Sequence, residues 1–554
     1  MSPSLRPYLV HFLLLLSAMV GVFFLFTYAG KHWAFAWAES PAREKGVVGQ
    51  REAGSPSVAS ETADEPAVKP IETTGSGGWM GEMLANWLKY QEDLTHRGAI
   101  SNEALLTFRD KAAYDKFLAD AAAAGLKVKG MDPDSLVVRV GYDKSSDLKK
   151  YLGDHADEGT KVAANYMVAP PEVPSAADRS NSNNVPFGSS GLDYIGVSNN
   201  ANYGKGVKIA VLDNAVSPES VFGNRLTSKQ LAEQASADIS HGTAVASIAG
   251  GINGVAPGSS LLSMAVVGAD GMSDSFTLGL GIRAAADAGA RILNISLGSY
   301  GDSSYLAESV AYAQQLGAVI VASNGNDGYT NSTYPARYEG VIGVGAIDVY
   351  GQVVSFSNAS QNYGLTAPGL EVTAAVPGEQ FEAFSGTSAA APFVTGAIAS
   401  VMSAYPGMSA RDAADLLITY ANDGGAAGVD ADYGYGIINV DRVLHRGVPN
   451  RNDLAVTANY FDLNASVGPT MQYVVQNQGT TLGVNWQLET STGGQNQIWT
   501  LPLLQPNAVT SISVPVNAAD LPAGVQFGSR LIVPQGTTDL NPQNNGRVTR
   551  VQTK

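Results

Sequence analysis

The sequence contains one stretch in which a potential nucleophile meets the start of a helix. Ser388 follows Gly386 and opens an apolar run of small residues that ends near Tyr405. Gly386 permits a tight turn, so we expect Ser388 on the first turn of a helix with its hydroxyl exposed. We place Pro392 in the same turn, where a proline gives up no hydrogen bond. The N–H groups of a helix start favour negative charge, and that of Ser388 can point at a developing oxyanion. The alternative is an ordinary helix N-cap.

Two residues upstream complete a set of reactive groups. The apolar run 207–213 ends in a carboxylate, which favours a buried parallel strand with Asp213 at its C-terminal end. His241 stands at the start of a second small-residue helix, which two glycines end. Taken separately, Asp213 could be a turn residue and His241 a helix cap. Together with Ser388 they supply the nucleophile, the base and the orienting acid of a serine hydrolase.

The order Asp213, His241, Ser388 and the residues around each resemble the subtilisin-like serine proteases. The resemblance covers 185–446, and short motifs carry it in the family's order: Val185–Gly188, Gly254–Pro257, Val267–Gly271, Asn294–Gly298, Gly325-Asn326, Tyr334–Tyr338 and Tyr433–Gly436. It implies an endopeptidase that cleaves protein or peptide substrates through an acyl-enzyme.

The resemblance also assigns roles to single residues. It implies that Asp213 orients the imidazole, that His241 is general base and then acid, and that Ser388 attacks the scissile carbonyl. Asn326 matches the asparagine whose side-chain amide stabilises the oxyanion in this family. The surrounding sequence, 324–328, is also typical of a turn, and both interpretations can hold.

Substrate contacts follow from the same resemblance. Two short strands would pair with an extended substrate backbone, which is recognition by strand addition; they comprise Gly271, Met272, Ser273, Ser296, Leu297 and Gly298. The pocket for the residue before the cut would be lined by Ala322, Ser323, Asn324, Gly325 and Thr333.

The sequence departs from the family's pattern at two places. The family usually has Ser or Thr followed by Gly after the aspartate, whereas this chain has Asn214 and Ala215. Alanine disfavours a positive φ, so we expect the turn after Asp213 to differ. The segment 248–255 is too short for the loop with which many relatives bind calcium. We therefore predict no metal site and no required cofactor, and leave calcium elsewhere open.

Composition narrows the possible partners and compartment. The chain has 554 residues, enough for three or four modules, and 45% of them are hydrophobic. The net charge of −16 argues against a nucleic-acid partner, which would need basic patches. With no cysteine, the chain has neither disulfides nor a thiolate site, which is compatible with an exported bacterial protein.

The N-terminal 95 residues show no catalytic motif. The segment 12–30 has no charged residue and is long for a signal peptide, so 1–38 is a signal peptide cut after Ala38 or a transmembrane anchor. Either places the protein outside the cytoplasm, in the bacterial cell envelope or secreted. Residues 39–95 form a flexible linker with an amphipathic helix at 79–97.

Residues 96–172 predict a ferredoxin-like α+β module of order β-α-β-β-α-β. Strands are expected at 104–108, 126–128, 136–140 and 162–168, and helices at 111–124 and 146–152. Its position before the subtilisin-like region resembles the family's propeptide, an intramolecular inhibitor removed by autocleavage. The cut is expected within 170–184, a Pro/Ser/Asn-rich loop. An independent binding module is the alternative.

The rest of the chain predicts two further modules. Residues 185–447 alternate strands and helices, for example at 291–296, 305–316 and 318–322, which favours an α/β fold with a doubly wound parallel sheet. Residues 450–554 contain short strands at 454–458, 470–475, 483–488, 511–514 and 529–533, typical of an immunoglobulin-like sandwich.

The sandwich weakly resembles the CARDB-type adhesion modules of bacterial surface proteins, through 453–456, 475–479 and 541–545. It would recruit substrate, bind a cell-envelope ligand or stabilise the chain. The leading hypothesis is an exported serine endopeptidase made as a zymogen. The alternatives are a catalytically silent surface-binding protein and a dedicated maturation protease with few substrates.

Overall fold

The computed structural model of the chain describes residues 71–72, 98–155, 159–175, 184–198, 200–360, 364–462, 465, 468–517 and 524–551. All of these belong to one compact unit, Thr62–Lys554. The apolar segment at 12–30 and the helix expected at 79–97 lie outside the described residues.

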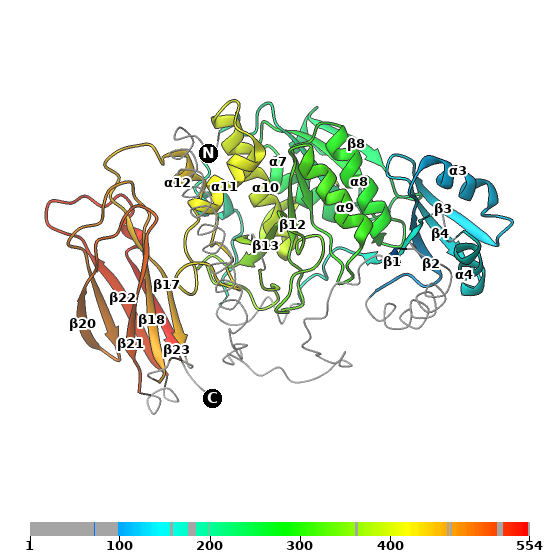
Figure 1. Cartoon of the computed structure of the whole chain (residues 1–554). Helices are drawn as coiled ribbons and strands as arrows, with labels where there is room; N and C mark the ends of the chain where they lie inside the picture. The colour runs from blue at the N-terminus through cyan, green and yellow to red at the C-terminus, as the bar shows by residue number, and fades with distance from the viewer. Residues whose placement is uncertain are drawn as a thin grey trace, which may run out of the picture. The chain divides into compact units, whose positions relative to one another are not determined.

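A seven-stranded parallel sheet forms the centre of the described chain, as the sequence predicts (Figure 1). Its strand order is β14-β13-β12-β11-β7-β9-β8, and each neighbouring pair is parallel. The strands are β7 (Lys208–Asp213), β8 (Leu226–Gln230), β9 (Ser260–Ala265), β11 (Ile292–Ile295), β12 (Val319–Ser323), β13 (Ile342–Ile347) and β14 (Leu365–Pro368).

Helices cover both faces of this sheet. On β7, Ile209 and Val211 enter one apolar core with α7 and α10, while Ala210 and Leu212 enter a second core with α8 and α9. Successive residues of a strand point to opposite faces, so this near-continuous apolar run is what a doubly covered strand requires. The helices are α7 (Ser240–Gly250), α8 (Ser275–Asp287), α9 (Ser304–Gln315), α10 (Thr387–Ala404), α11 (Ala410–Thr419) and α12 (Val440–Leu444). Shorter elements are α6 (Gly191–Tyr194), η2 (Ser220–Phe222) and the hairpin β15 (Val372–Val376) and β16 (Gln380–Phe384).

Within the described part of the chain, α10 alone is long and apolar enough to cross a membrane, and 83% of it is buried inside the protein. It packs on α7 and on four strands of the sheet. Its apolarity is therefore that of a core helix.

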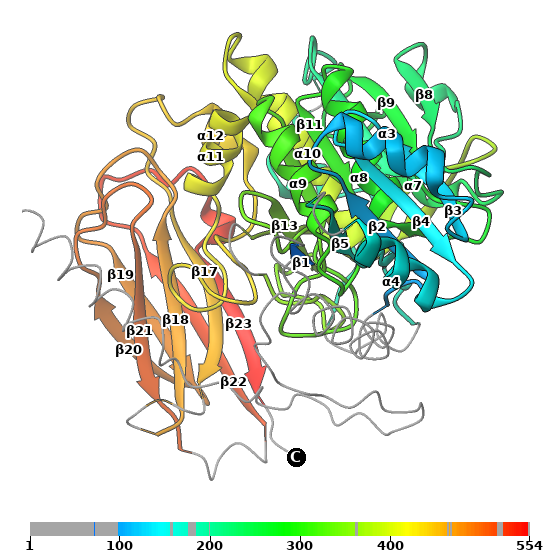
Figure 2. The same cartoon turned by 45° about the vertical axis from the view of Figure 1, so that its right-hand side comes forward.

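The N-terminal sheet has the order β1-β5-β2-β4-β3, all antiparallel, and two helices pack on it (Figure 2). The elements follow the predicted order β-α-β-β-α-β, preceded by β1: β1 (Ile71–Glu72), β2 (Glu103–Thr107), α3 (Lys111–Asp120), β3 (Leu126–Asp132), β4 (Val137–Tyr142), α4 (Ser145–Asp154) and β5 (Lys161–Ala163).

Two expectations for this region were wrong. The strand expected at 162–168 is two strands, because β6 (Met167–Val168) leaves the sheet and pairs with β10 (Ser273–Asp274). The buried Asn165 side chain lies at the break and bonds Ser275 and Phe276, which draws the chain away from the sheet. β1 lies where a flexible linker was expected. A strand of two residues is too short to show an alternating pattern of apolar and polar residues in the sequence.

The C-terminal module consists of two antiparallel sheets, β17-β18-β21 and β20-β19-β22-β23. Its elements are β17 (Leu454–Asp462), β18 (Thr470–Asn477), β19 (Gln487–Thr492), β20 (Gln495–Thr500), β21 (Val509–Pro515), β22 (Val525–Ile532), η4 (Pro542–Asn544) and β23 (Gly546–Val551). The strand expected at 483–488 begins later, at Gln487, because Gly483 instead forms a bridge with Leu504.

Arg442 of α12 joins this sandwich to the central module. Its side chain is buried, and Nη1 donates to Ala421 O at 2.7 Å and to Gln476 Oε1 of β18 at 3.3 Å. Nη2 donates to Asn507 Oδ1 at 2.6 Å. Burial lowers the pKa of Arg442 to about 10. A guanidinium withdrawn from water needs these acceptors, so both modules depend on the contact.

We expect Arg442→Ala to lower the free energy of unfolding by about 2–4 kcal/mol, because buried acceptors in both modules lose their charged donor. Thermal unfolding followed by circular dichroism measures the loss. Arg411→Ala, which breaks an exposed ion pair on α11, is the matched control and should cost less than about 1 kcal/mol. Equal effects of the two substitutions would contradict a joining role for Arg442.

Candidate active site

Asp213 and His241 form a hydrogen-bonded pair at the carboxyl edge of the parallel sheet. Asp213 ends β7 and is fully buried, while His241 is the second residue of α7. His241 Nδ1 lies 2.8 Å from Asp213 Oδ1. Nε2 of His241 is buried and has no hydrogen-bond partner among the described residues. The carboxylate thus holds Nδ1 as a donor and leaves Nε2 as a base.

The environment of His241 shifts its pKa. Burial by itself lowers the pKa, but the charge of Asp213 and its hydrogen bond, with a smaller effect of Asp238, outweigh burial and raise the pKa above the ordinary value. Asp213 therefore favours the protonated ring, which is the form that a base reaches after it takes a proton.

Asn214 explains how the chain tolerates its departure after Asp213. Its backbone N–H donates to Asp213 Oδ1 at 2.8 Å, and its Oδ1 accepts from Gly242 N at 2.7 Å at the start of α7. Neither Asn214 nor Ala215 has a positive φ. The side chain of Asn214 therefore ties the aspartate to the histidine helix without the glycine turn of the family.

Ser388 lies in the first turn of α10, where the sequence predicts it. Gly386 precedes the helix with φ 130°, a conformation that side chains disfavour, and a Cβ there would lie 2.8 Å from Asn326 Nδ2. Ser388 is buried, not exposed, and its Oγ donates to Ser296 O at a long 3.4 Å. No hydrogen bond joins Ser388 to His241 in the described chain, although α10 packs on α7. Such catalytic contacts are often loose until substrate binds.

Pro392 is not in the first turn of α10, as the sequence analysis expected, but inside the helix. A proline there cannot donate to the carbonyl four residues earlier, which is that of Ser388. Ser296 Oγ lies 3.2 Å from this oxygen and donates to it. The side chain of Ser296 therefore replaces the missing helix bond directly beneath the candidate nucleophile.

Asn326 faces the same helix start. Its Oδ1 accepts from the backbone N–H and the hydroxyl of Thr387, each at 2.9 Å. This leaves its Nδ2 as a donor, and Nδ2 donates to the carbonyl oxygen of Glu172 at 2.9 Å. The amide is thus oriented so that its N–H group points at a peptide carbonyl.

The chain segment 167–172 occupies the strands expected to bind substrate. β6 pairs antiparallel with β10, and Ala169 forms a two-way bridge with Gly298, with N···O distances of 3.0 and 2.8 Å. Gly271 and Met272 were expected in the same strand, but Gly271 adopts φ 77° in a turn that Gly268 and Met272 close, and the strand begins at Ser273. A left-handed glycine turn cannot continue a ladder, so the strand begins two residues later than expected.

The expected pocket residues are packed together. Ala322, Ser323, Asn324, Gly325 and Thr333 are all buried. Thr333 N donates to Asn324 O at 3.0 Å, and a Cβ on Gly298 would meet the Thr333 hydroxyl at 2.4 Å. Thr333 therefore faces the strand segment that carries Gly298, and its role in selecting substrate stays a prediction.

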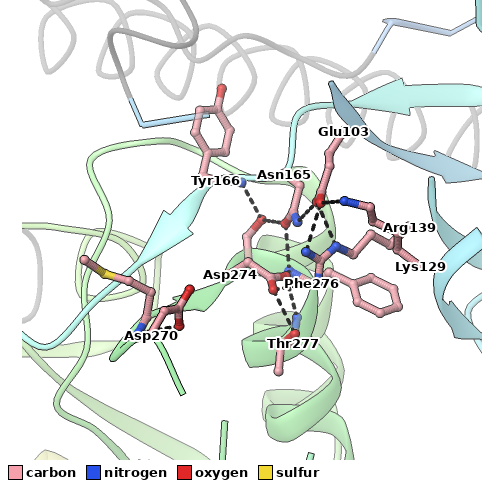
Figure 3. A network of polar contacts seen from close by, with 11 residues as sticks. Glu103, Lys129, Arg139, Asn165, Tyr166, Asp270, Asp274, Phe276 and Thr277 are labelled. Atoms are coloured by element: carbon pink, nitrogen blue, oxygen red, sulfur yellow. Dashed lines mark hydrogen bonds and ion pairs between the residues drawn. The ribbon is translucent and has the colours of Figure 1, made fainter. Parts of the chain in front are cut away.

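A buried polar network that the sequence analysis did not anticipate ties the N-terminal module to the same strand (Figure 3). Arg139 of β4 donates to Glu103 Oε2 at 2.8 Å and to Asp274 Oδ2 at 2.9 Å. Asp274 also caps α8 by accepting from Phe276 N and Thr277 N, each at 3.0 Å. No sequence motif marks such pairs, because Glu103, Arg139 and Asp274 come from three distant segments.

Electrostatics holds this network in its charged form. Burial by itself raises the pKa of Glu103, but hydrogen bonds from Arg139, Lys129 and Asn165 outweigh it and lower the pKa below its ordinary value. Burial by itself lowers the pKa of Arg139, but the hydrogen bond and charge of Glu103 and the charge of Asp274 outweigh burial and raise it. The Arg139 guanidinium thus pairs with both buried carboxylates, and Lys129 adds a second cation at Glu103.

Metal ligands do not gather in this part of the protein. The residues that the structure describes include no group of three or more His, Asp or Glu side chains that could hold a metal ion. The segment 248–255 contains the end of α7 and a short turn. Calcium dependence therefore stays an open expectation.

Comparisons with known proteins agree with this geometry. Residues 204–436 match the model of the Subtilase family. Subtilisin BL from Lederbergia lenta is 33% identical over 265 residues, which are 46% of this chain and 97% of that protein. An alkaline protease from Alkalihalobacillus alcalophilus is 32% identical over 50% of this chain and 73% of its own length.

The crystal structure of fervidolysin from Fervidobacterium pennivorans, described as a keratinolytic enzyme related to subtilisin, matches with a TM-score of 0.54 at 20% identity. The match covers 79% of this chain and 87% of that one. It therefore extends beyond the 204–436 segment and supports the fold alone.

We expect Asp213→Asn to lower the pKa of His241, because the substitution removes the charge that stabilises the imidazolium and leaves burial, which favours the neutral ring. The measurement is an NMR titration of ¹⁵N-histidine-labelled protein, which has six histidines. Asp441→Asn, at an exposed carboxylate that pairs with His445, should leave the pKa of His241 unchanged. An unaltered pKa in Asp213→Asn would remove the stated cause of the shift.

Proposed function

This chain belongs to the subtilase family and is a serine endopeptidase, and on this premise we propose that it acts through Asp213, His241 and Ser388 and is made as a precursor that cuts itself. The observation that carries the proposal is the position of residues 167–172. A peptide segment lies along the expected substrate strands, with one carbonyl oxygen on the Asn326 amide.

The proposed reaction is acyl transfer to Ser388. Its Oγ attacks the scissile carbonyl carbon while His241 Nε2 takes the hydroxyl proton, and Asp213 stabilises the imidazolium. Asn326 Nδ2 and the backbone N–H of Ser388 stabilise the oxyanion. His241 then gives the proton to the departing amine, and the C–N bond breaks to leave an acyl-enzyme. Water attacks the ester in a second, equivalent step and regenerates Ser388.

We propose that the first bond cut is Glu172–Val173. The carbonyl oxygen of Glu172 is the one that Asn326 holds, at 2.9 Å. Pro170 and Pro171 lack N–H groups, so the ladder cannot continue past Ala169, and in the described chain Glu172 is the next residue that bonds the site, through Asn326. Val173 is 72% exposed, as the first residue of a departing strand should be.

We propose that the module 96–172 inhibits the enzyme until it dissociates. Support comes from the network in which Arg139 compensates Glu103 and Asp274, because Asp274 belongs to the strand that would pair with substrate. After the cut, these contacts and the β6 pairing would keep the module in place. Export remains part of the proposal and is supported by the charge-free segment 12–30.

We expect residues 39–554 of the wild type to release a fragment ending at Glu172, with Val173 as the new N-terminus, while Ser388→Ala stays intact. Gel time courses and N-terminal sequencing measure this. A fluorophosphonate should label the cut wild type at Ser388 only. An intact wild type that is folded, and that stays unlabelled after cleavage by another protease in 173–184, would sink the proposal.

We expect Arg139→Met to shorten the lag between the cut and full activity several-fold. The substitution keeps the apolar stem but, among the described residues, leaves Glu103 with Lys129 as its cation and Asn165 as a neutral donor, and leaves Asp274 without a paired cation. This weakens the contact that retains the module. Activity is followed after rapid dilution. Arg109→Met, at an exposed arginine of the same module, is the matched control. Identical lags in both variants would mean that the network does not hold the module.

A further inference from the structure

A fully buried asparagine lies behind the loop that carries Asn326. Asn358 Oδ1 accepts from the backbone N–H groups of Asp327 and Tyr329, at 3.0 and 2.9 Å. Its Nδ2 donates to the carbonyl oxygen of Asn324 at 3.1 Å and to the hydroxyl of Tyr300 at 2.9 Å. A primary amide can make four hydrogen bonds of this kind, and Asn358 makes all four.

The backbone around Asn358 fixes the same loop. Its own N–H donates to Gly325 O at 3.0 Å, and Gly328 N donates to Phe356 O at 2.8 Å. The approach is close enough that a Cβ on Gly325 would lie 2.4 Å from Asn358 Nδ2. The side chain thus bonds the residues on both sides of Asn326 and fills the space behind Gly325.

The chemistry of the loop sets the orientation of the Asn358 amide. Two N–H groups on one side require an acceptor, and a carbonyl on the other side requires a donor. Aspartate could keep the accepting side, but a carboxylate oxygen would then face the Asn324 carbonyl. The position therefore favours an amide over a carboxylate of the same shape.

We infer that Asn358 is a positioning residue, which holds the loop so that the Asn326 amide points at the oxyanion. The inference rests on the proposed role of Asn326 in catalysis. In the described chain, the Asn326 side chain bonds α10 through its Oδ1, by Thr387, and Gly325 N also donates to Thr387 Oγ1 at 3.2 Å. Asn358 holds the backbone on both sides of Asn326, at Asn324 and Asp327. A donor that drifts by about 1 Å can lose a large part of its effect on the rate.

The test is a double-mutant cycle on Asn358→Asp and Asn326→Ala. The precursors are matured with a trace of tagged wild-type enzyme, which is then removed, and active sites are counted with a fluorophosphonate. The substrate is a synthetic peptide of residues 166–175. We expect Asn358→Asp to lower kcat about 10- to 100-fold with KM changed less than about twofold. In the Asn326→Ala background the same substitution should change kcat less than about threefold, because there is no amide left to position.

The outcomes separate this inference from the proposed function. If Asn326→Ala alone leaves kcat unchanged, the oxyanion role of Asn326 falls, and the inference falls with it. If Asn326→Ala lowers kcat but Asn358→Asp has no effect, or reduces kcat by the same factor in both backgrounds, the inference alone is overturned.

Folding is controlled separately. Asn477→Asp changes a fully buried asparagine of the sandwich that also braces a loop, donating to Thr481 O and Leu504 O. It should leave kcat unchanged at a comparable loss of thermal stability. If Asn358→Asp does not fold, Asn358→Ser, which replaces the amide with a single hydroxyl, takes its place in the cycle with the same two criteria.

Discussion

The hydrogen bond between His241 Nδ1 and Asp213 Oδ1 is the contact on which the rest of the site depends. It needs a carboxylate that water cannot reach, and the parallel sheet provides this by burying β7 on both faces up to its last residue. The carboxyl ends of the strands meet at this edge, and α7 and α10, which pack on each other, begin with His241 and Ser388 in their first turns. Asn214 adds the bond that ties the strand end to the histidine helix.

The same edge presents unpaired backbone to whatever peptide lies beside it. In this chain that peptide is its own segment 167–172, which uses main-chain bonds to Ser273, Asp274 and Gly298. Main-chain pairing is indifferent to sequence, so it gives affinity without selecting a side chain. The polar network around Arg139 supplies what the short ladder lacks, namely contacts specific to this one module.

The sequence predicted the parts of the structure that local patterns encode. The parallel sheet, the positions of Asp213 and Ser388 on their elements, and the α/β order of the N-terminal module all follow from apolar runs and turn residues. It failed where the outcome depends on residues far apart in the chain. The split of 162–168 into two strands depends on the hydrogen bond between Ser275 and Asn165. The position of Pro392 inside α10 depends on Ser296, whose hydroxyl donates to the Ser388 carbonyl in place of the missing proline N–H. Gly271 was placed in a strand by the family resemblance, whereas its φ of 77° puts it in a turn.

The buried Arg442 has a mechanical consequence for the whole protein. Arg442 bonds both Ala421 and Gln476 of β18, and Gln476 Nε2 also donates directly to Ala421 O at 3.1 Å. The next residue, Asn422, pairs with Ile437, and Gly436 O accepts from Thr366 N of the edge strand β14. A pull on the C-terminal sheet is therefore carried by short, directed bonds into the central sheet and is not absorbed by a slack tether. If the protein were attached to a surface by this end, a force on the attachment would be transmitted to the same sheet that positions the reactive groups.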